Sequence, residues 1–418
     1  MPRPFVVVAL VALAGLSLGQ AQPVADQAPA SIAPVLAELD RELAEEFAAD
    51  GVGGASIGVV AGAALVWARN YGDADMEAGR PATSDSAYRI GSITKQFTAL
   101  AVLQAVEQGK MRLSDPIEKY VPEVRQLRDA YAGTPPVTLL QVGTMTAGIA
   151  REPDCEGPLD GPVSRWVDKL LECIPGTGYA NEPGTQYLYS NIGYAMLGLA
   201  VERAVGMPFT TFVEQNTFEP LGMTRTAFEP NDTIRQDLAH VYRQPRGRGR
   251  GRGRGAQAPP TVAPSAPSRE QADRELDGRG YKIPNGAILS TITDLARFVA
   301  WELGEGPGGV LDRETQASNY RRVSSATNAR GELTLSSGYG MGFQASRRGN
   351  VVMLGHGGST AGYHASALFH RETKLGVVVL LGCDSCAFDA GPVATRVLLR
   401  LVAAMRSSDD SSVPTALR

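Results

Sequence analysis

Apolar residues recur on one helical face near the start of the chain, over residues 31–49, and acidic residues occupy the other face. The apolar positions are Ile32, Val35, Leu36, Leu39, Leu43 and Phe47. Spacings of three and four residues predict an amphipathic helix. The next stretch, "GASIGVVAGAALVWARNYG", is β-rich and predicts two strands joined at Ala61-Gly62.

The far end of the chain has the same strand-like character. The runs "YGMGFQAS", "VVMLGHGG", "YHASALFH" and "LGVVVLLG" are short and separated by glycine or charged turns, and "PVATRVLLRLVAAM" predicts a closing amphipathic helix. Between the two ends the periodicity is mostly helical. We therefore expect an α+β chain in which both ends build one sheet domain, residues 31–80 plus 333–410, around an inserted helical domain, residues 81–332.

One segment, residues 243–273, fits neither part. It holds five Arg-Gly pairs followed by a proline-rich stretch, with no period that could bury a face. Arg-Gly runs also contact single-stranded RNA, but no aromatic residue interleaves these repeats. A disordered, solvated insertion is the favoured interpretation, and contact with anionic cell-envelope polymers is the alternative.

Composition and charge narrow the class of partner. The 418 residues are 43% apolar and 20% charged, with a formal net charge of −4 and a pI of about 5.7, so no global field attracts nucleic acid. We expect a small-molecule or peptide substrate. The sequence has no phosphate-binding loop or dinucleotide fingerprint, and no cofactor or metal is expected. It leaves the oligomeric state open.

Residues 1–21 predict a secretory signal peptide, cleaved after Ala21. Arg3 supplies the positive start, an apolar run extends from Phe5 to Gly19, and small residues precede the cleavage point. The apolar run is short compared with the roughly 20 residues that span a bilayer. We expect a periplasmic or secreted protein without stable membrane insertion, and an uncleaved N-terminal anchor is the alternative.

Four cysteines accompany this export signal. In an oxidising compartment an even number favours disulfides, and Cys155 with Cys173 would close a Gly- and Pro-rich loop. Cys383 and Cys386 have the spacing of a thioredoxin-type redox pair, but the βαβ pattern of that fold is absent here. A structural disulfide is therefore favoured over redox catalysis and over zinc binding, although the spacing alone does not fix the connectivity.

Two serine motifs compete as the nucleophile. Ser56 lies in "GASIG", which matches the G-x-S-x-G elbow, but that elbow needs a strand before the serine and a helix after it. Here a helical pattern precedes Ser56 and a β-rich run follows, so an ordinary strand serine is favoured. Ser92 and Lys95 form the second motif, S-x-x-K, at the start of the strongly apolar helix "ITKQFTALAVLQAVEQG".

The S-x-x-K pair supports acyl transfer if the helix is buried. Residues three apart share a helix face, so Lys95 would stand beside Ser92. Burial lowers the pKa of a lysine, and a neutral amine can accept the serine proton. An N-capping serine with a solvent-facing lysine is the alternative, which the motif alone does not exclude.

Two further motifs follow in order along the chain. Tyr189-Ser190-Asn191 enters another apolar helix, and His356-Gly357-Gly358 lies at the end of a predicted strand. With these motifs in this order, the sequence resembles the serine β-lactamase and penicillin-binding protein superfamily, especially its class C-like branch, which includes D,D-carboxypeptidases and esterases. Phrases typical of the branch, such as "YRIGSITKQFTAL" and "EPGTQYLYSNIGYAMLG", extend the resemblance over residues 32–405 without the insertion.

The resemblance implies an antiparallel β-sheet flanked by helices, with a helical domain, and it implies roles for individual residues. Either Lys95 or Tyr189 would be the general base, and the residues leave that choice open. By this resemblance, Ser92 would be the acylated nucleophile, Lys95 its base or proton relay, and Tyr189 the proton shuttle to the leaving group. Asn191 would position Lys95 and the substrate amide, and His356, Gly357 and Gly358 would correspond to the K-T-G strand element. The backbone N–H groups of Ser92 and Ser359 would form the oxyanion hole.

The sequence departs from the branch in two places. His356 stands where β-lactamases usually have lysine, so any positive charge for a substrate carboxylate would depend on pH. The segment "LLQVGTMTAGI" replaces the usual "LLTHTSGI". The other histidines, His240, His364 and His370, are expected to be structural or on the surface.

The resulting hypothesis is an exported, cofactor-independent serine hydrolase that acts on an ester, a β-lactam or a D-amino-acid peptide. The alternative is a non-hydrolytic peptidoglycan or β-lactam sensor on the same fold.

Overall fold

The computed structural model describes residues 28–243, 268–269, 278–320, 324–327, 333–384 and 386–412. The expected signal peptide, residues 1–21, lies outside the described residues. So does the insertion at residues 243–273, except for Arg243 and Ser268–Arg269. What the sequence predicts for those two segments stays a prediction.

Within the described residues, nine strands form one sheet in which every neighbouring pair is antiparallel. In spatial order the strands are β3 (Arg80–Pro81), β2 (Ala64–Asp75), β1 (Gly54–Ala61), β13 (Leu375–Leu381), β12 (Tyr363–His370), β11 (Val351–Thr360), β10 (Gln344–Arg348), β9 (Leu333–Tyr339) and β8 (Ser324–Thr327).

The sheet joins the two ends of the chain through β1 and β13. Ile57 pairs with Val379 and Gly58 with Val378 along seven consecutive positions of register. Every residue of β13 is buried, because both faces of the sheet are covered there. The expected antiparallel sheet built from both ends is confirmed. It also takes in β8, which lies upstream of the range 333–410 given from the sequence.

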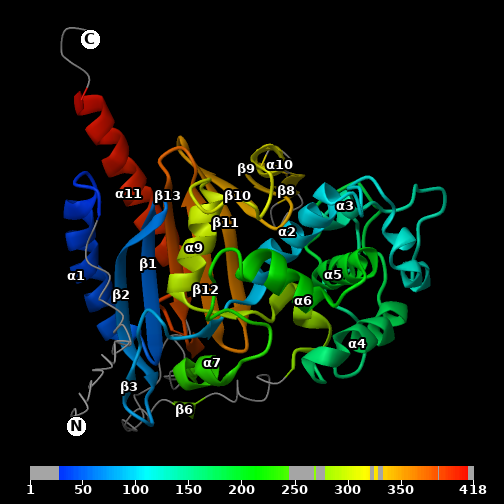
Figure 1. Ribbon diagram of the computed structural model, residues 1–418, viewed down its shortest axis with the longest axis horizontal. Coiled ribbons are helices and arrows are strands. Elements are labelled where there is room, and N and C mark those ends of the chain that lie inside the picture. The colour runs from blue at the N-terminus through cyan, green and yellow to red at the C-terminus, as the bar shows by residue number, and fades with distance from the viewer. Residues whose placement is uncertain are drawn as a thin grey trace, which may run out of the picture.

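One face of the sheet is covered by the first and last helices, α1 (Ala33–Asp50) and α11 (Ala390–Ser412), which lie side by side in Figure 1. Successive strand side chains alternate between faces, so Ile57, Val377 and Val379 pack against these helices. The helices are also linked by ion pairs on their outer side, such as Arg400 Nη1 to Glu42 Oε2 at 2.6 Å.

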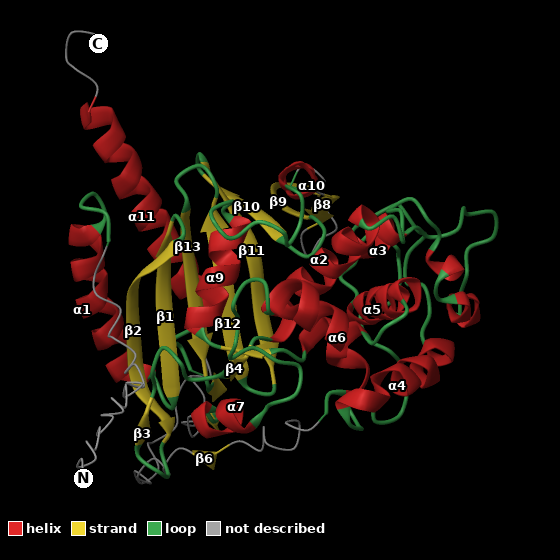
Figure 2. Ribbon diagram, viewed as in Figure 1, coloured by secondary structure: helices red, strands yellow, loops and turns green. Residues whose placement is uncertain are grey.

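The opposite face is covered by α9 (Ile292–Glu302), which lies in front of the strands in Figure 2. Val378 and Leu380 of β13 share a buried cluster with Leu295 and Val299 of α9. The sequence assigned this helix to the inserted helical domain, but its apolar stripe packs on the sheet. The pattern of α9 predicts an amphipathic helix without saying which neighbour it covers.

The helical region lies beside the sheet and surrounds α2 (Thr94–Glu107), in which residues 94–105 are all buried. A helix that is apolar nearly all round is stable only inside the protein. It packs against α5 (Asn191–Val205) and α8 (Ile283–Gly286). The other helices are α3 (Leu139–Gly143), α4 (Trp166–Cys173), α6 (Phe209–Val213), α7 (Asp232–Asp237) and α10 (Arg313–Asn319).

Short strand pairs and two disulfides link segments outside the nine-stranded sheet. β4 (Tyr88–Arg89) pairs with β7 (Leu289–Ser290), and β5 (Tyr242–Arg243) lies between β14 (Cys383–Asp384) and β6 (Ser268–Arg269). Disulfides join Cys155 to Cys173 and Cys383 to Cys386. In the part of the chain that the structure describes, no helix combines the length and apolar character needed to cross a membrane.

Candidate active site

Ser92 lies on a single 3-10 turn, η1 (Gly91–Ile93), that leads directly into α2. Gly91 has a φ of 52°, and a β-carbon there would lie 2.7 Å from the backbone nitrogen of Ser359 on β11. Glycine meets both demands, the left-handed conformation and the close approach. The cap position of α2 belongs to Ile93, with no side-chain cap hydrogen bond, so Ser92 is not an N-cap.

Lys95 is completely buried one helical turn beyond Ser92. Its Nζ lies 3.2 Å from Ser92 Oγ and donates a 2.8 Å hydrogen bond to the carbonyl oxygen of Asn285. Burial lowers the pKa of Lys95 well below its usual value, the charge of Lys282 lowers it further, and Glu152 opposes the shift. The alternative of a solvent-facing lysine is therefore wrong.

The residues around Tyr189 hold it beside Lys95. The backbone N–H of Leu188 donates to the carbonyl oxygen of Met145 at 2.7 Å, and the Ser190 hydroxyl caps α5 by accepting a backbone N–H at 3.0 Å. These contacts leave the Tyr189 ring centroid 4.9 Å from Lys95 Nζ. The unusual segment at Met145 therefore supports the tyrosine by a backbone contact.

The two candidate bases have pKa values shifted in opposite directions. Burial raises the pKa of the Tyr189 phenol above its usual range, although a hydrogen bond with Ser92 lowers it in part. Burial lowers the pKa of Lys95. Each shift follows from the cost of placing a charge where water is excluded. The site therefore favours a neutral amine beside a protonated phenol.

Asn191 begins α5, but its side chain makes no hydrogen bond to Lys95 among the described residues. Its Nδ2 donates to Glu152 Oε1, and its buried Oδ1 has no hydrogen-bond partner among the described residues. Glu152 also accepts from the Tyr281 hydroxyl and lies 3.8 Å from Lys282 Nζ. Asn191 thus belongs to a polar cluster behind Lys95 instead of contacting the amine directly.

His356 lies on β11 with only 1% of its surface exposed. Its Nε2 lies 3.0 Å from the Tyr339 hydroxyl, and its Nδ1 contacts the carbonyl oxygen of Gly357. Burial, and in second place the Lys95 amine when it is protonated, lower the pKa of His356 to about 3. The histidine is neutral at ordinary pH, so the pH-dependent positive charge expected from the sequence is not supplied near neutrality.

Gly358 allows β11 to run close to the nucleophile turn. A β-carbon at Gly358 would overlap the carbonyl oxygen of Ile90 and lie 3.1 Å from the backbone nitrogen of Ser92. The backbone nitrogens of Ser92 and Ser359 thus lie on two closely apposed segments. Two backbone N–H groups on neighbouring segments are what an oxyanion hole requires.

These groups open into a cleft of about 530 Å³. Ser92, Tyr189, His356 and Ser359 line it, as do Arg151 and Asp389. His364 on β12, which the sequence assigned to a structural or surface role, pairs with Ser359 and also lines the cleft. Among the described residues, no group of three or more His, Cys, Asp or Glu side chains is placed to hold a metal ion.

The sequence reasoning missed Glu152, Asn285 and Tyr339. Glu152 is the third residue after the segment "LLQVGTMTAGI", whose sequence differs from that of the branch, and this was a weak signal. Asn285 contributes only a backbone oxygen, and Tyr339 begins the run "YGMGFQAS", which gave its hydroxyl no role. Only the folded chain brings them to Lys95 and His356.

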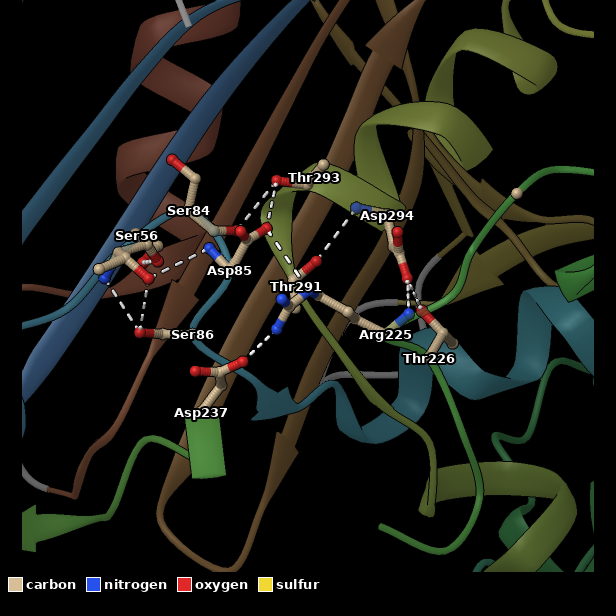
Figure 3. A network of polar contacts seen from close by, with 12 residues as sticks. Ser56, Ser84, Asp85, Ser86, Arg225, Thr226, Asp237, Thr291, Thr293 and Asp294 are labelled. Carbon is tan, nitrogen blue, oxygen red and sulfur yellow. Dashed lines mark hydrogen bonds and ion pairs between the residues drawn. The ribbon is translucent and has the colours of Figure 1, made fainter. Parts of the chain in front are cut away.

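Ser56, the competing nucleophile, lies away from this cleft in the middle of β1 and is fully buried. Its hydroxyl donates to the Thr83 carbonyl oxygen at 3.1 Å and lies 3.1 Å from the Tyr88 hydroxyl. Figure 3 shows Ser56 beside the turn at residues 84–86, in a network that continues to Asp294 at the start of α9. The strand continues past Ser56, so the strand-turn-helix elbow is absent and a structural role fits.

The antiparallel sheet with a helical region beside it is the architecture of the serine β-lactamase and penicillin-binding protein superfamily. A family model described as Beta-lactamase matches residues 39–400, and the chain belongs to this family.

Two curated relatives show how far the similarity extends. Protein flp of Staphylococcus aureus (strain MRSA252) is 23% identical over 348 residues, which is 83% of this chain and 63% of the relative. AmpH of Escherichia coli (strain K12), a D-alanyl-D-alanine-carboxypeptidase/endopeptidase, is 30% identical over 239 residues, 55% of this chain and 58% of the relative. The chain thus spans about 63% of the length of the first of these relatives.

Two solved structures resemble the fold. The octameric penicillin-binding protein homologue from Pyrococcus abyssi aligns with a TM-score of 0.68 and 25% identity, over 88% of this chain and 77% of its own. The β-lactamase/D-alanine carboxypeptidase from Pseudomonas syringae aligns with a TM-score of 0.66 and 19% identity, over 89% and 99% of the two chains.

Proposed function

We propose that this protein is an exported serine hydrolase that forms an acyl-enzyme on Ser92 with an ester, a β-lactam or a D-amino-acid peptide. The observation that carries the proposal is the buried Lys95 amine, 3.2 Å from a hydroxyl that lines an open cleft. Membership of the β-lactamase family supports the same class of reaction. Export is supported by residues 1–21 and by the two disulfides, which are typical of oxidising compartments.

In the acylation step, Ser92 Oγ attacks the substrate carbonyl and its proton passes to the neutral amine of Lys95. The Asn285 carbonyl already accepts one hydrogen of that amine, which orients the nitrogen. The negative charge on the former carbonyl oxygen is stabilised by the backbone N–H groups of Ser92 and Ser359. A buried lysine with a lowered pKa is suited to this role, because a general base works best near the operating pH.

When the tetrahedral intermediate collapses, the bond to the leaving group breaks and that group takes the phenol proton of Tyr189. The phenol then regains a proton from the Lys95 ammonium, 4.9 Å from the Tyr189 ring centroid. A water molecule hydrolyses the Ser92 ester in the second half of the cycle, with the same groups moving the protons in reverse.

One observation also supports a second candidate function, that of a sensor that becomes acylated on Ser92 and does not turn over. The family's usual lysine cation is replaced by His356, which is buried and neutral, so the cleft differs electrostatically from that of a typical β-lactamase. A slow second half-reaction would make such a protein a covalent β-lactam or peptidoglycan sensor.

The proposal is tested with a fluorophosphonate and a labelled penicillin, read out by intact-mass spectrometry. We expect a stoichiometric adduct on the wild type and on Ser56→Ala, and none on Ser92→Ala. Turnover of p-nitrophenyl esters, nitrocefin and D-alanyl peptides then separates the substrate classes. A penicillin adduct that persists while all substrates remain uncleaved would favour the sensor, and labelling of Ser56 would refute the assignment.

A further inference from the structure

Arg151 lies over the face of Tyr189 at the mouth of the cleft. Its guanidinium carbon is 4.9 Å from the Tyr189 ring centroid, and 64% of its side chain is exposed. The backbone beneath it is fixed, because the Arg151 carbonyl accepts the Asn191 N–H at 2.8 Å and the Ala150 carbonyl accepts the Ser190 hydroxyl at 2.9 Å. The side chain is therefore accessible while its base is held against the start of α5.

The charge of Arg151 is only weakly compensated by protein groups. Its Nε lies 3.8 Å from Glu152 Oε1, which is too long for a hydrogen bond. Glu152 also accepts hydrogen bonds from Asn191 and Tyr281 and lies near the Lys282 amine. Among the described residues, no protein acceptor takes a hydrogen bond from the Arg151 guanidinium, so its donors are available to a molecule in the cleft.

No other lysine or arginine lines the cleft in the described part of the chain. His356 is buried and neutral, with both ring nitrogens occupied by Tyr339 and Gly357. Asp389 has the opposite charge and accepts the Gly391 N–H at the start of α11. Among the described residues that line the cleft, a permanent positive charge is therefore offered to a substrate at one place, beside Tyr189.

We infer that Arg151 binds a carboxylate on the leaving group of the substrate, and so makes the protein selective for substrates whose departing part is an anion. This inference rests on the proposed function, in which Tyr189 gives its proton to the leaving group. A guanidinium over the ring of Tyr189 then lies next to the departing part. Arginine suits the task because its planar fork donates two parallel hydrogen bonds to one carboxylate.

The test compares two acetyl esters that differ in one group of the leaving phenol: 3-acetoxybenzoate, which carries a carboxylate, and 3-acetoxybenzamide, which is neutral. We expect Arg151→Gln to lower the ratio of kcat/KM for the carboxylate substrate to kcat/KM for the amide by roughly tenfold or more, mainly through a higher KM for the carboxylate substrate. Arg151→Lys should keep part of the preference, because it retains the charge without the fork.

Arg165→Gln is the matched control. It removes the same charge from a side chain that is 69% exposed and ion-paired with Asp168, outside the cleft lining. Arg165→Gln should leave the ratio of the two kcat/KM values unchanged. A loss of selectivity in this variant would show that the overall charge of the protein, and not Arg151, causes the preference.

Two results would overturn the inference. One is an equal fall for both esters in Arg151→Gln. The other is a loss confined to p-nitrophenyl hemisuccinate, whose carboxylate lies on the acyl part, while the benzoate pair is unaffected. Failure of the proposed function is distinct from both, because the wild type would then form no adduct on Ser92 with any probe and cleave neither ester.

Discussion

Lys95 Nζ donates a 2.8 Å hydrogen bond to the backbone carbonyl oxygen of Asn285, 190 positions further along the chain. The amine is thus oriented by a backbone group of α8, a helix distant in sequence from both α2 and β11. The same contact places a nitrogen with a lowered pKa 3.2 Å from Ser92 Oγ. The candidate site is therefore assembled where α2, α5, α8 and β11 meet.

Lys95→Met should abolish acylation without weakening the fold. Loss of a general base is expected to lower kcat/KM by about 10²–10⁴-fold. The free energy of unfolding should stay equal or rise, because a fully buried amine that is costly to desolvate is replaced by an apolar side chain of similar length. Ester turnover and thermal unfolding check the two parts, with exposed Lys110→Met as the control. Activity within tenfold of wild type would remove Lys95 from the mechanism.

Lys282→Gln should move the acid side of the pH profile to higher pH. Activity requires the neutral amine of Lys95, so it falls as the pH drops through the Lys95 pKa. The Lys282 cation is one cause that lowers this pKa, and its removal raises it. The measurement is kcat/KM against pH for a neutral ester at constant ionic strength. A shift to lower pH would contradict the assignment of Lys95 as the base.

Glu152→Gln should move the same side of the profile in the opposite direction. The Glu152 carboxylate raises the pKa of Lys95, so its removal lets that pKa fall further and extends activity to lower pH. The amide is close in size to the carboxylate and can still accept from Tyr281. Opposite shifts in the two variants would be hard to explain by a general loss of structure, and equal shifts would show that another group controls the profile.

Gly358→Ala should disable the site by moving β11 away from the nucleophile turn. The new β-carbon would overlap the Ile90 carbonyl oxygen, which is backbone and cannot rotate away. Displacing the Ser359 N–H from an oxyanion hole is expected to cost about 10²–10³-fold in kcat. Gly308→Ala is the control, since nothing lies within 4 Å of a β-carbon there. A Gly358→Ala enzyme with wild-type kcat would argue against that oxyanion hole.

Removal of the Cys155–Cys173 disulfide should destabilise the protein more than removal of Cys383–Cys386. The cysteines are 18 positions apart in the first pair and 3 in the second, and a longer closed loop restricts the unfolded chain more. The paired Cys→Ser variant of the first bridge should lose about 3 kcal/mol in denaturant unfolding. Equal losses of unfolding free energy from the two Cys→Ser variants would show that packing around each bridge matters more than the length of the loop it closes.

Much of the fold could be predicted because its signals are local. The helix at α1, the strands β1 and β2 and the run from β10 to β13 each have their own periodicity or turn residues. No local pattern indicated which face of the sheet α9 covers or that β8 pairs with β9. Both depend on which segments distant in sequence come together. Burial of Lys95 followed from the apolar character of the residues around it on α2.

The residues of the site that belong to sequence motifs could be predicted, and the others could not. Ser92, Lys95 and Tyr189 lie together, but Asn191 contacts Glu152, which no motif identified. The charge state of His356 also could not be predicted, since it depends on complete burial and on Tyr339 from a neighbouring part of the sheet. Sequence spacing identifies which residues can take part, whereas their ionisation follows from the neighbours that folding supplies.

The pairing of β1 with β13 also has a consequence for how the protein is made. The two strands are residues 54–61 and 375–381, so more than 300 residues of chain must be synthesised after β1 before the two strands can meet. Contacts this distant in sequence slow folding, while helices such as α2 and α5 form locally and early. A nascent chain therefore cannot pair β1 with β13 until β13 has emerged, and the apolar side chains of β1 stay exposed until then.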